Sequence, residues 1–102
     1  MNKIFLDEFI AQIEGLSKSC GKDDSVIDRY GVHQKADVLK SYVSAAKDLV
    51  KYGEYLIALE NILDNLAESS ILLDEKVINL ARQAFGEKIT KEYELLLEKF
   101  TK

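Results

Sequence analysis

The chain of 102 residues contains no proline, no tryptophan, one cysteine and one histidine. Without proline, only glycine and capping side chains can interrupt a helix. The lone Cys20 excludes an internal disulfide, and with it a secreted scaffold held together by disulfides. Cys20 and His33 are too few for a zinc cluster, and neither a phosphate-binding glycine loop nor a nucleophile elbow occurs. We therefore expect no metal, no cofactor and no enzymatic activity.

Long apolar runs are also missing. No run approaches the roughly 18 residues that are needed to cross a bilayer. Asp7 and Glu8 interrupt the start of the chain, where a signal peptide would need an apolar core. The net charge of −4 disfavours a general nucleic-acid binder, because phosphate contacts need clustered lysine and arginine. These features predict a cytosolic protein that binds neither membranes nor nucleic acid directly.

What the chain does have is a hydrophobic fraction of 47%, ample for one core in a single domain spanning residues 1–102. Its apolar residues recur at helical spacing, and no segment alternates with a period of two. The expected fold is all-α, a compact bundle of five to six antiparallel helices. The predicted helices cover residues 3–19, a short segment around 26–30, 34–52, 54–69, 74–85 and 88–100.

Capping residues and glycines set the expected boundaries. Asp23 or Asp24 can cap the short helix, which Gly31 would end. Gly53 suits the position just past a helix end, and so short a connection favours an antiparallel pair of helices over 34–52 and 54–69. Asp74 can accept hydrogen bonds from the free N–H groups of the next helix.

The negative charge is concentrated in one segment. Residues 53–75 hold six acids and no lysine, arginine or histidine, whereas the rest of the chain has 12 acids and 14 basic residues. On the helix over 54–69, Glu60, Asp64 and Glu68 recur every four residues, opposite the apolar stripe. Such like-charged pairs repel by a few tenths of a kcal/mol, and no basic residue in the segment relieves the repulsion.

Ile57 falls among these acids, next to Glu60, Asn61 and Asp64 on the helix surface. An apolar centre with a charged rim is typical of a protein interface. The alternatives are an ordinary solvated helix surface and weak magnesium capture by surface carboxylates; the Glu-x-x-His pattern of di-metal bundles does not occur. The predicted partner-binding residues are Glu54, Ile57, Glu60, Asn61, Asp64, Glu68 and Asp74.

Residues 43–86 also carry a family pattern. It consists of Val43, Ala46 and Leu49, the turn Gly53-Glu54-Tyr55, the helix with Ala58-Leu59-Glu60 and Asp64-Asn65-Leu66, and then Leu73, Ile78, Leu80-Ala81 and Gly86. The pattern resembles the small helical immunity proteins of bacterial polymorphic toxin systems, of the MafI and contact-dependent growth inhibition type.

The resemblance implies a function. Such a protein would bind the C-terminal domain of a cognate secreted toxin, in a 1:1 complex, and neutralise it by blocking rather than by chemistry. A nuclease, in particular a ribonuclease, would offer a basic cleft for the acidic helix. Carried over to this sequence, the toxin-facing acids would be Glu54, Glu60, Asp64 and Glu68. The residues holding the helix on the core would be Tyr55, Leu59 and Leu66.

Two other functions are compatible with the sequence. A non-enzymatic adaptor or a homo-oligomeric subunit could use exposed aromatic residues, for which Tyr52, Tyr93 and Phe100 are candidates. A small enzyme would have to use a glutamate, a tyrosine or His33, but a single histidine in a turn before a helix is usually a capping or solvated residue.

Overall fold

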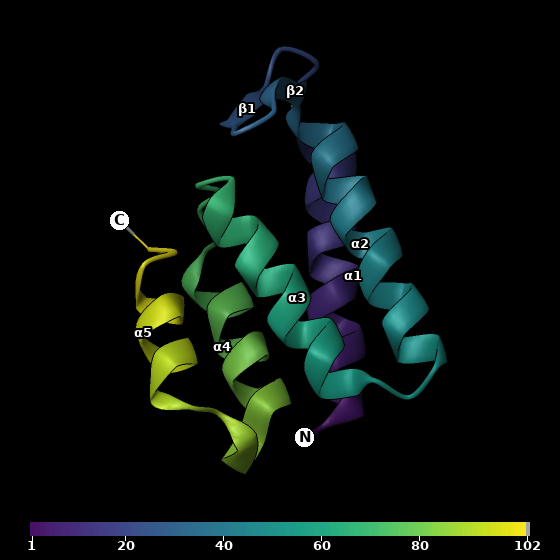
Figure 1. Cartoon of the computed structure of the whole chain (residues 1–102), viewed down its shortest axis with the longest axis vertical. Coiled ribbons are helices and arrows are strands. Elements are labelled where there is room, and N and C mark those ends of the chain that lie inside the picture. The colour runs from purple at the N-terminus through teal and green to yellow at the C-terminus, as the bar shows by residue number, and fades with distance from the viewer. Residues whose placement is uncertain (102) are drawn as a thin grey trace.

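Helices make up most of the chain in the computed structural model, which describes residues 1–101 and only the backbone of Asp28 (Figure 1). This confirms the predicted all-α class, to which a small two-stranded sheet is added. The elements are α1 (Lys3–Ser19), β1 (Ser25–Asp28), β2 (Gly31–Gln34), α2 (Lys35–Lys51), α3 (Tyr55–Glu68), α4 (Glu75–Phe85), the 3₁₀ turn η1 (Gly86–Lys88) and α5 (Lys91–Glu98). No helix within residues 1–101 is long and apolar enough to span a membrane.

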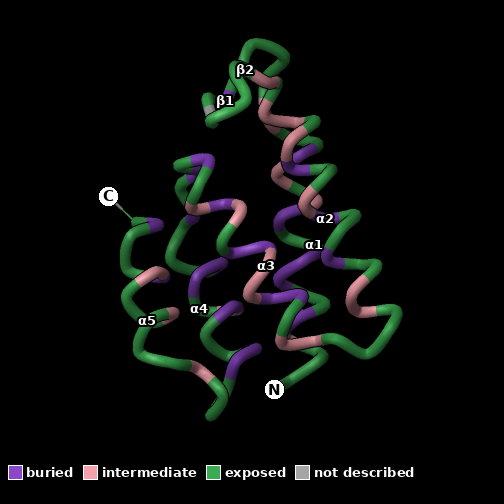
Figure 2. The backbone as a smooth tube through the Cα atoms, in the orientation of Figure 1, coloured by how far each residue is buried: buried purple, intermediate pink, exposed green. Residues whose placement is uncertain are grey.

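Most of the core lies between the first four helices, and Leu97 and Phe100 extend it at the C-terminal side. α1 packs against α2 and α4, α2 also packs against α3, and the short α5 lies against α4. Figure 2 shows buried positions along the inner sides of α1, α3 and α4, whereas the β-hairpin is mostly exposed. The largest side chains that are fully buried are Phe9, Phe85, Leu6, Ile13, Leu39, Leu59, Ile62, Leu63, Leu66 and Leu97.

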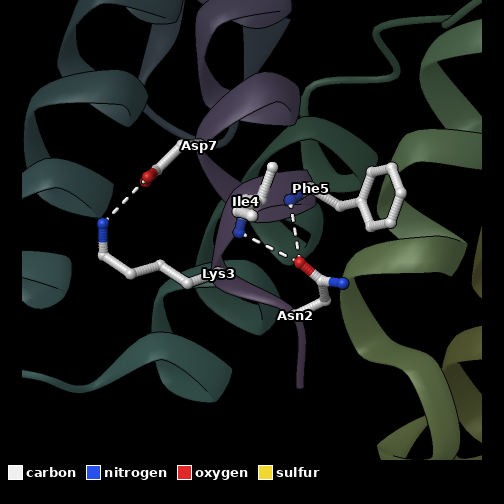
Figure 3. A network of polar contacts seen from close by, with 5 residues as sticks. All are labelled: Asn2, Lys3, Ile4, Phe5 and Asp7. Carbon is white, nitrogen blue, oxygen red and sulfur yellow. Dashed lines mark hydrogen bonds and ion pairs between the residues drawn. The ribbon is translucent and has the colours of Figure 1, made fainter.

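Asn2 fixes the start of α1. Its side-chain oxygen accepts hydrogen bonds from the backbone N–H groups of Ile4 at 3.0 Å and Phe5 at 3.3 Å (Figure 3). These bonds satisfy two donors that have no partner inside the helix. The backbone N–H of Asn2 donates to the carbonyl of Ala84 at 2.8 Å, which ties the beginning of the chain to the end of α4.

The turn between α2 and α3 follows from the glycine. Gly53 adopts φ +77°, a region that glycine enters without steric cost. Its N–H donates to the carbonyl of Val50 at 3.0 Å, and the N–H of Glu54 donates to that of Leu49 at 2.9 Å. This pair of bonds is the Schellman motif. It reverses the chain within a few residues, so α2 and α3 run antiparallel, as predicted (Figure 1).

Asp74 caps α4, as predicted. Its Oδ1 accepts from the backbone N–H of Val77 at 2.9 Å. Replacing Asp74 with alanine should lower the free energy of unfolding by about 1 kcal/mol, the usual cost of losing such a cap. Urea unfolding followed by circular dichroism measures the change. Asp74→Asn keeps an accepting oxygen and should stay within a few tenths of a kcal/mol of the wild type; equal losses in both variants would rule out the capping explanation.

The predicted short helix around residues 26–30 is wrong. Residues 25–28 and 31–34 instead pair as antiparallel strands, with Val26 opposite His33 and Ile27 opposite Val32. Valine and isoleucine favour strands, and a helix of about five residues is too short to be stable on its own. Glycine at position 31, with φ +126°, follows the two-residue loop and lets the chain reverse.

The predicted cap at Asp23 or Asp24 is wrong for the same reason. The Oδ2 atom of Asp24 accepts from the backbone N–H of Gly21 at 2.8 Å, which closes a turn before β1 rather than starting a helix. The carbonyl of Asp24 then accepts from the N–H of Lys35 at 2.9 Å, so the base of the hairpin is closed where α2 begins. The hairpin is thereby joined to the helical body.

Candidate partner-binding face

The helix α3 presents two different sides. Its buried side consists of Ala58, Leu59, Ile62, Leu63 and Leu66, and Tyr55 is partly buried against the same core. The opposite side holds six of the predicted residues: Glu54, Ile57, Glu60, Asn61, Asp64 and Glu68. We call these six residues the acidic face. Glu54, Asp64 and Glu68 are exposed, Glu60 and Asn61 are half-buried, and the side chain of Ile57 remains 50% exposed among them.

One carboxylate of the acidic face has a basic partner that the local sequence did not indicate. Both Nη2 and Nε of Arg29, in the hairpin loop, donate to Oε1 of Glu68, at 2.7 and 2.9 Å. The segment 53–75 itself contains no basic residue, but Arg29 from the hairpin loop offsets the repulsion at Glu68. Both side chains are largely exposed, so this ion pair contributes less than about 1 kcal/mol to stability.

Tyr93 of α5 borders the acidic face at Asp64. Its ring packs against Phe85 with centroids 5.4 Å apart, and its hydroxyl donates to Oδ2 of Asp64 at 3.1 Å. Burial, the hydrogen bond to Asp64 and the nearby charges of Glu60 and Glu92 raise the pKa of Tyr93 well above its ordinary value of 10.0. Tyr93 is thus a neighbour that orients Asp64 rather than the exposed aromatic side chain that the adaptor hypothesis required.

The raised pKa of Tyr93 predicts a loss of stability in alkali. The folded protein holds this proton more tightly than the unfolded chain does, so the stabilisation is complete below pH 10 and decreases as the pH rises above it. Urea unfolding on both sides of pH 10 tests this, with Tyr93→Phe as the control. The variant should lose less stability above pH 10 than the wild type; equal losses would show that Tyr93 does not carry the effect.

Two of the remaining predicted residues have structural roles. Asp74 lies outside the acidic face, at the start of α4, where its carboxylate serves as the cap described above. Phe100 is 2% exposed and belongs to the core, so its predicted exposure is wrong. Tyr52, by contrast, is 77% exposed at the end of α2.

His33 lies in β2, half-buried, instead of in the turn that the sequence suggested. Among the side chains that the structure describes, no group of three or more from histidine, cysteine, aspartate or glutamate is arranged to hold a metal ion.

Sequence reasoning missed the apolar side of the hairpin. Ile27, Tyr30 and Val32 are all more than two-thirds exposed, and Arg29 between them contacts the acidic face. The sequence does contain a hairpin signal: β-branched residues flank a two-residue loop, and glycine follows directly after that loop.

No protein-family model matches the chain, and neither a curated protein nor a solved structure is significantly similar to it. A functional assignment therefore depends on the acidic face and on the sequence pattern of residues 43–86.

Proposed function

We propose that this chain is an immunity protein that binds and neutralises the C-terminal domain of a cognate secreted toxin. The toxin domain has a basic active-site cleft, as a ribonuclease does, and the two proteins form a 1:1 complex in the cytoplasm. The immunity protein acts by occupying the cleft and performs no reaction itself.

The observation that carries this proposal is the acidic face of α3. Within residues 1–101, Glu54 and Glu60 form no ion pair, and Asp64 receives its hydrogen bond from a neutral tyrosine. These carboxylates therefore keep most of their negative field for solvent. A cleft that binds nucleic acid is lined with lysine and arginine, so carboxylates can take the positions of phosphates and also accelerate association.

The same helix carries the centre of the family pattern. Ala58 and Leu59 of the pattern face the core, whereas Glu60 and Asp64 of the same pattern face outward. The resemblance to helical immunity proteins and the exposed charge thus involve the same fourteen-residue helix.

The test uses the toxin domain encoded by the reading frame directly upstream of this gene. Co-production with this chain should restore growth to cells that the toxin domain kills. The two purified proteins should form a 1:1 complex by light scattering, with an affinity that falls as salt is added. Cell death despite co-production, or the absence of a complex, would refute the proposal.

A homo-oligomeric or adaptor role is the second candidate, and the exposed Tyr52 favours it. Tyrosine is enriched at protein interfaces because it combines a large apolar ring with a polar tip. Light scattering of the protein alone distinguishes the two candidates. Self-association would be supported by a molecular mass that doubles as the concentration rises in the wild type and stays at the monomer value in Tyr52→Ser.

A further inference from the structure

The two faces of the hairpin have different surroundings. Val26 is 7% exposed and belongs to the core, and its cross-strand neighbour His33 is half-buried. On the other face, Ile27 and Val32 lie directly opposite each other and are 73% and 68% exposed. Tyr30, in the loop, is 79% exposed. We call Ile27, Tyr30 and Val32 the hairpin patch.

Strand pairing favours β-branched residues at positions 27 and 32, but threonine would also satisfy that preference, so folding does not require an exposed apolar patch here. Among the described residues, nine large apolar side chains are exposed, and three of them fall within six consecutive positions. Side chains that remain exposed gain little from the hydrophobic effect. A single exposed apolar residue is ordinary, but a cluster on a projecting element is typical of an interaction site.

The apolar surface continues onto the helical body. A groove between β1 and the connection from α3 to α4 is lined on one side by Ile27 and on the other by Ile71 and Leu72. Leu72 is 47% exposed. The rest of its lining is Val26 and four polar residues, Ser25, Lys35, Ser69 and Ser70, so the groove combines apolar and polar groups, as protein interfaces do.

The hairpin patch adjoins the acidic face. The hydrogen bonds from Arg29 to Glu68 hold the hairpin loop beside the C-terminal end of α3, and Figure 1 shows the hairpin beyond that end of the helix. The guanidinium of Arg29 also lies 5.7 Å from the centre of the Tyr30 ring. One residue therefore contacts both surfaces, and a partner docked on one would meet the other.

The charge on the chain decides which partner fits. A second copy would bring its own acidic face towards this one, with an overall charge of −4 on each chain. A basic protein meets no such repulsion. We infer that the hairpin patch is the apolar anchor for the same basic partner that the acidic face attracts, inserting into an apolar pocket beside the partner's basic cleft. This inference rests on the proposed function, because it concerns the same complex.

The experiment measures the affinity of the upstream-encoded toxin domain at several salt concentrations. The variant Ile27→Thr/Val32→Thr keeps β-branched side chains in both strands and adds no charge. It should bind at least tenfold more weakly at every salt concentration, with an unchanged salt dependence, because only apolar contact is lost. The variant Glu60→Gln/Asp64→Asn should instead reduce the salt dependence.

A matched control is available at the other end of the molecule. Ile4 is 70% exposed in the first turn of α1, near the N-terminus, far from the hairpin (Figure 1). Ile4→Thr makes the same chemical change and should leave the affinity unchanged. Tyr30→Ser, outside both strands, should weaken binding as the strand variant does, with the hairpin intact by circular dichroism.

The outcomes separate the two proposals. If the wild type binds in a salt-dependent way and the hairpin variants bind with the same affinity, the inference is overturned, whereas the proposed immunity function is not. A wild type that does not bind the toxin domain would overturn both. A protein that self-associates alone, and becomes monomeric on Ile27→Thr/Val32→Thr, would make the hairpin patch an interface between copies and refute the inference.

Discussion

Under the proposed immunity function, replacing both Glu60 and Asp64 with lysine should abolish protection against the toxin domain. Each substitution removes an attractive carboxylate and places a like charge against a basic cleft. Losing a desolvated charge pair at an interface costs on the order of 2–5 kcal/mol, which corresponds to roughly a 30- to 5,000-fold weaker complex. Calorimetric titration gives the affinity, and growth of cells that produce both proteins gives the biological effect.

Two control variants isolate the role of the charges. Tyr93→Phe removes the hydrogen bond to Asp64 but keeps the carboxylate, so it should preserve protection. Glu8→Lys/Glu87→Lys changes the net charge by the same amount at exposed positions on α1 and in η1, outside the acidic face. Cells that produce the Glu60→Lys/Asp64→Lys variant and still survive would show that the acidic face is not needed for protection. An equal loss of affinity and protection in Glu8→Lys/Glu87→Lys would show that only the net charge matters.

Phe9→Ala should have the largest effect on the fold. Phe9 is fully buried on α1, the helix that packs against both α2 and α4. Truncating a buried phenylalanine costs about 3–5 kcal/mol, because contacts are lost and a cavity is left. A domain of this size is stabilised by only about 5–15 kcal/mol, so the melting temperature should fall by more than about 10 °C. Thermal unfolding followed by circular dichroism measures it.

Tyr52→Ala is the matched surface truncation. Its side chain is 77% exposed, so the free energy of unfolding should change by no more than about 0.5 kcal/mol. Melting of Phe9→Ala at the wild-type temperature would contradict the packing described for α1.

Most of the helical architecture could be predicted because its signals are local. The periodic apolar residues mark the inner sides of α1, α2 and α3, and the spans predicted for these three helices agree with the structure to within one residue at each end. The helix predicted over residues 88–100 is shorter, Lys91–Glu98, because Thr90 caps its start. Gly53 and Asp74 each act through a hydrogen bond to a residue three positions away. Both partners of such a hydrogen bond lie within one helical turn, so a short stretch of sequence is enough to predict it.

The hairpin escapes a prediction that treats each apolar segment by itself, although β-branched residues flank its two-residue loop, because a strand is stabilised by its pairing with the neighbouring strand. Val26 and Ile27 alone fit a short apolar helix as well as a strand, and only their pairing with His33 and Val32 decides between the two. Phe100 is a similar case. Its carbonyl accepts from the N–H of Leu73, so the residues that follow α5 lie against the connection that precedes α4.

The candidate site was partly predictable for the same reason. Helical periodicity places Glu60, Asp64 and Glu68 on the outer side of α3. It does not reveal that Arg29, 39 positions earlier, lies against Glu68, or that Tyr93 contacts Asp64 from α5. These contacts depend on how the elements pack, which no local pattern specifies.

The division of α3 into two sides has an evolutionary consequence. Its inward residues are constrained by the core, whereas exposed positions such as Glu54 and Ile57 contribute little to folding. Substitutions can therefore accumulate on the outward side at almost no cost in stability. A lineage built on this scaffold could change what it recognises, step by step, while every intermediate sequence still folds.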